Sequence, residues 1–343
     1  MTLNYKRSQI AFLNFISWFL SSRSEYVFQK EPWQKQLFAN LIYESSFIED
    51  LEENKTIESQ DINLLEFKKA HYKNKDSKYL EPILRLAEYA NENLKEFLLD
   101  FIIHGSISTQ DYSIGWSDLD TLLIIKKEIL KSPEKMIELR GHLLKILPEL
   151  YIIDPLQHHQ FIITTEKAML DSSYLIFPSE TFKYSKSLFG EKTVKISNSR
   201  NNKTTKKSLL AVNNLFQKSF ESGYMNHHKK ENIALEDNFR NKYCMYQLKY
   251  FLSCIMILPT YYLDSIGNSC YKKYSFEKFY SMLNIDSEIL DKATKIREVW
   301  PEREEFPYKG NKIPDWVCEL LGNDYFKRAY NFSLEISKTI IKD

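Results

Sequence analysis

Apolar residues recur every three or four positions through much of the first third of the chain, which is the spacing of one face of an α-helix. The pattern predicts an aromatic-rich helix near the N-terminus, a second helix at 32–44 and a third at about 80–97. The third helix would bury one row of apolar residues: Ile83, Leu86, Ala87, Ala90, Leu94 and Phe97. The polar, acidic run at 49–61 is expected to be a solvated connection. Residues 1–97 are therefore predicted to form an N-terminal helical region.

The pattern changes near residue 98, where short apolar runs without helical periodicity begin. The runs at 99–103 and 121–125 are rich in Ile and Leu and predict two strands. A helix at 133–147 should follow, and then a hairpin built from 150–154 and 160–165. The expectation for residues 98–191 is thus a small mixed sheet with helices, and the fold class is α+β.

A polar, basic stretch at 192–207 has no apolar periodicity and is predicted to be a linker. Helical spacing returns beyond it, and predicts that 208–343 form a C-terminal helical bundle with helices at 208–223, 235–266, 276–283 and 325–341. The 235–266 segment is apolar nearly all round, as expected of a central bundle helix. Pro259 should kink or end this helix, because proline removes a backbone hydrogen bond.

Composition changes this picture little. The chain has 343 residues, of which 43% are hydrophobic and 27% charged, as in ordinary globular proteins. Twenty-two Tyr and twenty-two Phe beside only eight Gly favour helices with large aromatic contacts. A net charge of +1 provides no overall attraction to nucleic acid, which argues against a long nucleic acid as partner.

Two features of the sequence indicate the cellular compartment in which the protein resides. The four cysteines have no C-x-x-C spacing and are expected to be reduced thiols. Lys6-Arg7 and the apolar run at 10–20 imitate a signal peptide, but Asn14 and Ser17 interrupt the run and no small-residue cleavage site follows it. The run is also too short to cross a bilayer. We expect an amphipathic first helix in a cytoplasmic protein that has no membrane partner.

The candidate chemistry lies between the two predicted strands. Gly105-Ser106 closes the first apolar run, and Asp118-Leu119-Asp120 opens the second after an eleven-residue gap. Residues two apart in an extended chain share a face, so both carboxylates should project together. Crowded carboxylates repel each other unless a cation lies between them, and Mg²⁺ or Mn²⁺ suits such oxygen ligands. The competing interpretation is a turn in which the aspartates cap local backbone.

The Gly105-Ser106 part of this motif also fits a site for a phosphate group and its metal. If a helix begins near Ser106, the loop presents backbone N–H groups and a hydroxyl to an anion, and Gly105 allows close approach. Phosphate donors on one strand and metal carboxylates on its neighbour would together hold a nucleoside triphosphate with its metal. The reaction class that follows is nucleotidyl or phosphoryl transfer.

A strand ending in Gly-Ser, a gap of about ten residues and Asp-hydrophobic-Asp entering a second strand resemble the polymerase-beta-type nucleotidyltransferase superfamily. The segment from Tyr112 to Ser117 is similar to the approach to the Asp pair in its small stand-alone and antibiotic-modifying members. The resemblance implies metal binding and catalysis by Asp118 and Asp120. It also implies nucleotide binding by Gly105, Ser106 and Ser117.

The superfamily usually supplies a third carboxylate from the following hairpin, and here the sequence departs from that pattern. Asp154 is the only acid in that stretch and precedes Pro155, while the usual position would fall on His158, His159 or Gln160. Three alternatives stay open: Asp154 acts from the neighbouring strand, an imidazole replaces the acid, or only one metal binds tightly. A structural role in the turn is the competing interpretation for Asp154.

The acceptor side is less defined. In aminoglycoside-modifying relatives a glutamate of the first bundle helix is the base, whereas this chain has Asn213 and Asn214 near that place and its first acid at Glu221. Lys242 and Lys249 could reach triphosphate oxygens. The sequence therefore predicts a Mg²⁺- or Mn²⁺-dependent enzyme that moves a nucleoside monophosphate onto a hydroxyl of a small molecule or protein. The alternative is a non-catalytic protein that keeps the fold and binds a nucleotide or a partner.

Overall fold

The computed structural model describes residues 59–73, 76–157, 160–170, 179–197, 224–228, 231–234, 245–309 and 312–341, with isolated positions at 16, 20, 206, 209, 210, 213 and 214. The helices predicted near the N-terminus and at 32–44, and with them the signal-like run apart from Ile16 and Leu20, lie outside these residues. So do His158, His159 and Lys242.

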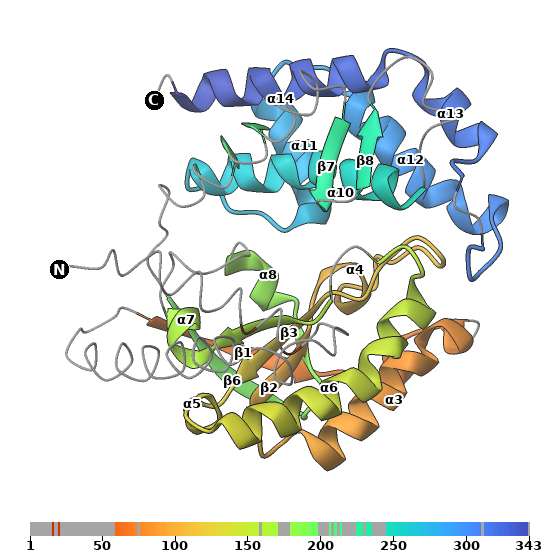
Figure 1. The fold of residues 1–343 in the computed structure, drawn as a ribbon. Helices are drawn as coiled ribbons and strands as arrows, with labels where there is room; N and C mark the ends of the chain where they lie inside the picture. Colours follow the sequence, from red (N-terminus) through yellow and green to blue (C-terminus); the bar gives the residue numbers. More distant parts are fainter. Residues whose placement is uncertain are drawn as a thin grey trace, which may run out of the picture.

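A six-stranded mixed sheet forms the centre of the first half of the protein, with strand order β4-β3-β2-β5-β1-β6 (Figure 1). Its strands are β1 (Ser59–Glu66), β2 (Leu98–Ile103), β3 (Thr121–Ile125), β4 (Ile162–Thr165), β5 (Lys186–Ser187) and β6 (Lys192–Ser197). β2 and β3 are antiparallel neighbours, so the end of β2 meets the beginning of β3. This pairing brings the Gly-Ser loop and the Asp pair to the same edge of the sheet.

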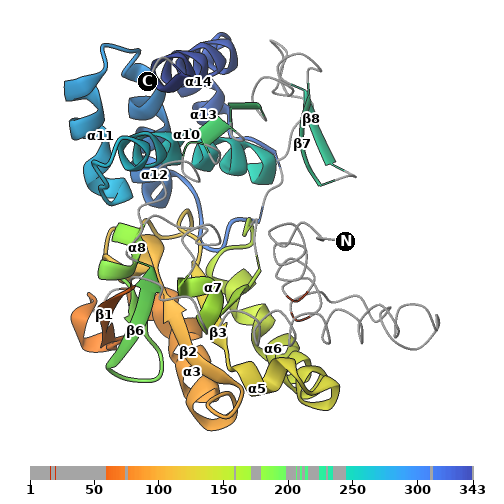
Figure 2. The ribbon, with the colours of Figure 1, turned by 90° about the vertical axis from the view of Figure 1, so that its left-hand side faces the viewer.

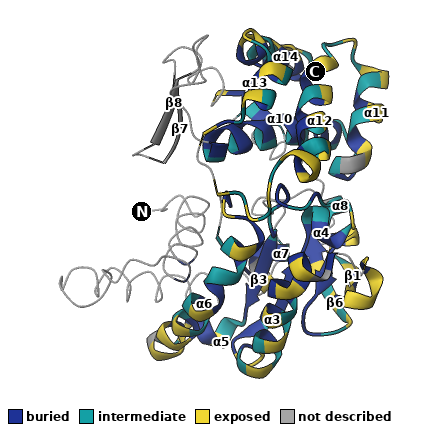
Figure 3. Cartoon of the chain, turned by 90° about the vertical axis from the view of Figure 1, so that its right-hand side faces the viewer, coloured by how far each residue is buried: buried dark blue, intermediate teal, exposed yellow. Residues whose placement is uncertain are grey.

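Both faces of the sheet are covered. Phe101 and Leu123 point to the side on which α3 (Ser77–Asn93), α5 (Lys127–Leu130) and α6 (Pro133–Ile153) pack. Ile102 and Leu122 point to the other side, toward α7 (Glu166–Leu170) and α8 (Ser179–Lys183). Two buried faces explain the continuous apolar runs of β2 and β3. Figure 3 shows the buried strands behind helices whose outer faces are exposed.

Helices make up the second half of the protein, which lies over the end of the sheet that carries α4 (Gly105–Ser108) (Figures 1 and 2). They are α10 (Met245–Ser265), α11 (Lys272–Met282), α12 (Glu288–Arg303), α13 (Asp315–Leu321) and α14 (Tyr325–Ile341). A two-stranded sheet, β7 (Tyr224–His228) and β8 (Glu231–Ala234), lies beside α10. The shared core is aromatic, with Phe251, Phe279, Trp300 and Tyr325 buried together.

The α+β class is confirmed, but the predicted hairpin is wrong. Residues 150–153 are the last turn of α6, and β4 pairs in parallel with β3. The helix extends past its predicted end because Leu147, Leu150 and Ile153 continue the apolar spacing and are buried against the sheet. Asp154 consequently lies at the end of a helix and not in a strand.

The sheet also extends beyond its predicted limits at both ends. Residues 192–197, predicted as linker, form β6, which pairs with β1, and β1 includes the end of the predicted solvated connection. β1 buries only Ile62 and Leu64, which alternate with exposed residues, and the first four residues of β6 alternate between partly buried and exposed, so both sequences are largely polar.

Pro259 does not end α10, which continues to Ser265 with Pro259 buried inside the bundle. Packing on neighbouring helices compensates here for the lost backbone bond. Every helix in the described part of the chain is too short or too polar to serve as a membrane span.

Candidate active site between the sheet and the helical bundle

The loop at the end of β2 faces the Asp pair directly. Gly105 has a φ of +70°, and a Cβ built on it would lie 1.8 Å from Oδ2 of Asp120. A side chain is excluded by this contact, and the positive φ independently favours glycine. The Asp120 carboxylate therefore lies directly against the backbone of Gly105.

Hydrogen bonds hold the Asp pair in an extended conformation. Leu119 is fully buried, and the Gln157 side-chain amide bonds both its N–H and its C=O at 3.2 Å, as a neighbouring strand would. Tyr79 donates to the Ser117 carbonyl at 2.6 Å, and the His104 N–H donates to the Asp120 carbonyl at 3.0 Å. Asp118 and Asp120, on either side of the buried Leu119, line the same cavities.

We call the first of these cavities, of about 280 Å³, the polar cavity. Six predicted site residues line it: Gly105, Ser106, Ser117, Asp118, Asp120 and Lys249. The helices of the bundle add Lys272 at the start of α11 and Arg297 on α12, which the sequence analysis missed. Each belongs to a segment with several surface charges, and no local pattern marks it as a site residue. The cavity thus combines four carboxylates, those of Asp111, Asp118, Asp120 and Glu298, with three cationic side chains.

Lys272 is electrostatically coupled to the Asp pair. Burial lowers its pKa, while the negative charges of Asp120 and Asp118 oppose that shift. A lysine in this environment is poorly hydrated and gains much from a further anionic partner. Its position fits a group that contacts a negatively charged ligand next to Asp120.

Asp154 does not line the polar cavity. Its side chain is fully buried, with one oxygen accepting from the Leu156 N–H at 2.9 Å and the other paired with the Lys249 ammonium group. Burial raises the pKa of Asp154, the Lys249 charge opposes the rise, and the Asp118 charge adds to it. The expected third metal carboxylate is therefore engaged in fixing Lys249. Within the described ranges, no group of three or more His, Cys, Asp or Glu side chains could hold a metal ion.

The segment between the Gly-Ser loop and the Asp pair connects the sheet half to α12. Asp111 forms an ion pair with Arg297 at 3.2 Å, and the Ser113 hydroxyl donates to the Arg297 carbonyl at 2.5 Å. The Trp116 ring packs edge-on against Trp300, with centroids 5.1 Å apart. The Ser117 hydroxyl accepts from the Ser113 N–H at 2.9 Å and so braces the segment. These contacts set the distance between the Asp pair and the helices opposite.

The chain matches no protein-family model and no curated protein. Function is therefore inferred from the residues around the Asp pair and from their arrangement.

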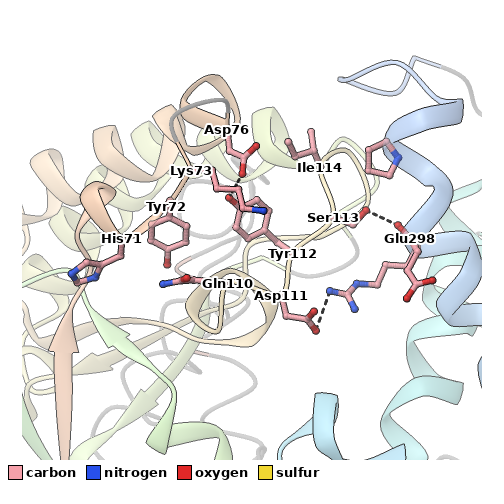
Figure 4. Close-up of a pocket in the computed structure, with 12 residues that line it drawn as sticks. His71, Tyr72, Lys73, Asp76, Gln110, Asp111, Tyr112, Ser113, Ile114 and Glu298 are labelled. Carbon is pink, nitrogen blue, oxygen red and sulfur yellow. Dashed lines mark hydrogen bonds and ion pairs between the residues drawn. The ribbon is translucent and has the colours of Figure 1, made fainter.

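A second opening, the outer cavity of about 390 Å³, lies behind the ion pair of Asp111 and Arg297 (Figure 4). Tyr112 donates to the Asp76 carboxylate at 2.6 Å within it. Asp111, Arg297 and Glu298 line both the outer and the polar cavity, so this wall separates the two.

A third opening, the apolar cavity of about 250 Å³, also reaches the Asp pair. Its wall includes Ile162 of β4 and one face of α10 carrying Tyr250, Cys254, Ile257 and Tyr261. The polar and apolar cavities share Gly105, Asp118, Asp120, Ser253, Tyr271 and Lys272. The Asp pair thus lies where two spaces of different chemical character meet.

Proposed function

We propose that this protein transfers a nucleoside monophosphate from a nucleoside triphosphate to a hydroxyl acceptor and releases pyrophosphate. One observation carries the proposal: Gly105 and Asp120 approach so closely that no Cβ fits between them. A phosphate group held at the Gly-Ser backbone would consequently contact the carboxylate pair. The resemblance to polymerase-beta-type nucleotidyltransferases supports the same reaction.

The polar cavity supplies groups suited to a triphosphate. The Ser106 hydroxyl and the Gly105 backbone would bind the β- and γ-phosphates. Lys249, Lys272 and Arg297 line the same space, and positive groups in a partly buried cavity bind phosphate oxygens strongly. Trp116 and Phe276 limit the entry of water on the same wall.

Asp118 and Asp120 are the residues that would hold Mg²⁺ or Mn²⁺. Magnesium in nucleotide sites is commonly bound by one or two carboxylates together with substrate phosphates and waters, so Asp118 and Asp120 suffice. When bound, the metal neutralises phosphate charge and polarises the phosphoryl group under attack. Asp154 instead fixes Lys249 in position.

The alternative is a protein that binds a nucleotide without transferring it. The observation that favours this alternative is the burial of Asp154 against Lys249, because it keeps the expected third metal carboxylate out of the cavity. Both functions require nucleotide binding in the polar cavity. They differ in whether pyrophosphate is released.

Calorimetric titration tests the proposal. ATP, GTP, CTP and UTP are titrated into the protein with MgCl₂ and, separately, with EDTA. We expect one nucleotide to bind tightly only with Mg²⁺ and Asp120→Asn to abolish that dependence. Pyrophosphate release in the presence of acceptors then separates transfer from binding alone. If none of the four nucleotides binds with Mg²⁺, the proposal is wrong.

A further inference from the structure

The apolar cavity is the second space that reaches the Asp pair. Of these two cavities, the polar one alone is lined by Ser106, Lys249 and Arg297. The apolar one alone is lined by His104, Ile162 and the α10 face that carries Tyr250, Cys254, Ile257 and Tyr261. The two spaces meet at Asp118 and Asp120. Lys272 lines both cavities, but the described residues that line the apolar cavity alone include no Lys, Arg, Asp or Glu, whereas the polar cavity adds Lys249 and Arg297.

Phosphoryl transfer is in line, so the acceptor oxygen approaches the α-phosphorus from the side opposite the departing pyrophosphate. Given the proposed function, on which this inference rests, the pyrophosphate would leave among Lys249, Arg297 and Ser106. The acceptor would then enter from the apolar cavity. The chemical character of that cavity therefore indicates the kind of acceptor.

The wall formed by α10 is aromatic and apolar. Tyr250, Cys254, Ile257 and Tyr261 recur at spacings of four, three and four, which places them on one helix face. This face is turned to the cavity while Leu252, Ile255 and Leu258 are buried in the bundle core. Burial raises the pKa of Cys254 to about 11 and that of Tyr261 to about 12, so both groups stay uncharged at neutral pH. Such a surface favours an apolar ring over a polyhydroxylated molecule.

Charge excludes another class of acceptor. Among the described residues lining the apolar cavity, the only carboxylates are Asp118 and Asp120, which the metal would occupy. An acceptor with several ammonium groups would lack counter-charges there. No further carboxylate of this cavity can remove a proton from an aliphatic alcohol, and the only imidazole among its described lining residues is that of the buried His104, so an acceptor with a more acidic hydroxyl is favoured.

A phenol meets both requirements. Its hydroxyl has a pKa of about 10, well below that of water at about 15.7, and its ring is apolar. A dry cavity of about 150 Å³ is large enough for benzene, so a space of about 250 Å³ accommodates a phenol ring with its substituent.

We propose that the acceptor is a phenolic hydroxyl, presented to the Asp pair through the apolar cavity. The phenolic oxygen forms a bond to the α-phosphorus as the bond from that phosphorus to the bridging oxygen of pyrophosphate breaks. Pyrophosphate keeps the bonding electron pair, and the phenolic proton passes to water. The product is an aryl phosphodiester of the nucleoside.

The test compares matched acceptors with the nucleotide that binds with Mg²⁺. N-acetyltyrosine amide and N-acetylserine amide differ in the type of hydroxyl, and 4-ethylphenol represents a phenol without a peptide backbone. Mass spectrometry detects the nucleotidylated product and a coupled assay follows pyrophosphate. We expect the tyrosine amide to be used at least about tenfold faster than the serine amide. Preference for 4-ethylphenol over the tyrosine amide would indicate a small-molecule acceptor of the same chemistry.

Variants of α10 test the location. Tyr250→Ala opens the cavity wall, and Tyr246→Ala, one turn earlier on the same helix and outside the cavity, is the matched control. We expect Tyr250→Ala to raise KM for the tyrosine amide about tenfold and to leave nucleotide affinity unchanged. The variant removes a ring that would contact the acceptor, and this ring would not contact the nucleotide. Tyr246→Ala should change neither quantity.

Three results overturn the inference. Equal use of the serine amide would show that a phenol is not selected. Reduced nucleotide affinity in Tyr250→Ala would show that this cavity holds the nucleobase. Mg²⁺-dependent nucleotide binding without any aryl product would reject the acceptor and leave the proposed function intact. Failure of every nucleotide to bind would instead reject the proposed function itself.

Discussion

The ammonium group of Lys249 on α10 pairs with the Asp154 carboxylate at the end of α6, and both side chains are almost completely buried. The pair links the helical bundle to the sheet half of the protein. Because water is excluded, each charge depends on the other for compensation. Asp154 thereby holds Lys249 at the wall of the polar cavity.

Lys249→Met should lower the free energy of unfolding by about 3–5 kcal/mol, because it leaves the Asp154 carboxyl buried without its partner. Replacing both residues, Lys249→Met with Asp154→Leu, should recover most of the loss. Urea denaturation of the two variants and the wild type measures both values. If Lys249→Met alone lowers the free energy of unfolding by less than about 1 kcal/mol, the buried pair contributes no more than a solvent-exposed ion pair does.

Asp118→Asn and Asp120→Asn should each abolish the Mg²⁺ dependence of nucleotide binding without reducing thermal stability. The fold should persist because each variant removes one of two neighbouring negative charges. Asp61→Asn on the exposed side of β1 is the control for a charge change far from the cavity. Calorimetry with and without EDTA gives the comparison, and unchanged Mg²⁺ dependence in both variants would refute the assignment.

Gly105→Ala should eliminate nucleotide binding, since its Cβ would force the Asp120 carboxylate away at a position that also has a positive φ. Gly141→Ala in the middle of α6 is the matched control, with no atom within 4 Å of the added Cβ. The control should instead stabilise the protein by about 0.5–1 kcal/mol through helix propensity. Nucleotide affinity and urea denaturation are measured for both. Wild-type affinity in Gly105→Ala would contradict the proposed phosphate site.

Lys272→Gln should weaken triphosphate affinity by about tenfold or more, because a poorly hydrated ammonium group beside the Asp pair would be lost. Lys278→Gln is the control, since this lysine lies exposed on the same helix. The pKa of Lys272 is lowered by burial, so wild-type affinity should begin to fall at a pH below the usual lysine range as the ammonium group loses its proton. Titrations at increasing pH compare the three proteins, and equal affinities for both variants would exclude a role for Lys272.

Asp100→Asn should change how stability depends on pH. Asp100 is fully buried on β2, where it accepts from the Ser187 hydroxyl at 2.6 Å, and burial raises its pKa. A raised carboxyl pKa in the folded state means that wild-type stability falls as pH rises from about 4 through that pKa. The stability of the wild type relative to Asp100→Asn should therefore decrease over this window. Urea denaturation at a series of pH values measures the difference, and an increase with pH would mean that folding lowers the pKa of Asp100.

Local pattern was sufficient for the parts of the site that are close in sequence. The apolar runs at 99–103 and 121–125 predict β2 and β3, and the polar residues at their ends place Gly105 beside the Asp pair once those strands are antiparallel neighbours. The alternation of Asp118, buried Leu119 and Asp120 follows from the period of an extended chain. Neither conclusion requires knowledge of the bundle.

The spacing of apolar residues was misleading where burial depends on packing against elements that are distant in the sequence. The run from Leu150 to Ile153 fits the apolar spacing of a helix as well as that of a strand, and local pattern favours the strand. Packing on the sheet makes this run the last turn of α6. β1 and β6 were missed because one face of each is polar, and only their pairing shows that they belong to the sheet.

By itself, the sequence determined the Gly-Ser loop, the Asp pair and the α+β class, because those depend on periodicity within a few residues. Tertiary structure alone decided that Asp154 turns away from the cavity to Lys249 and that Lys272 and Arg297 join the site. It also decided that an aromatic face of α10 lines one of the cavities that reach the Asp pair. Those residues come from helices far apart in the chain, and their meeting depends on how the bundle packs over the sheet, which no local spacing encodes.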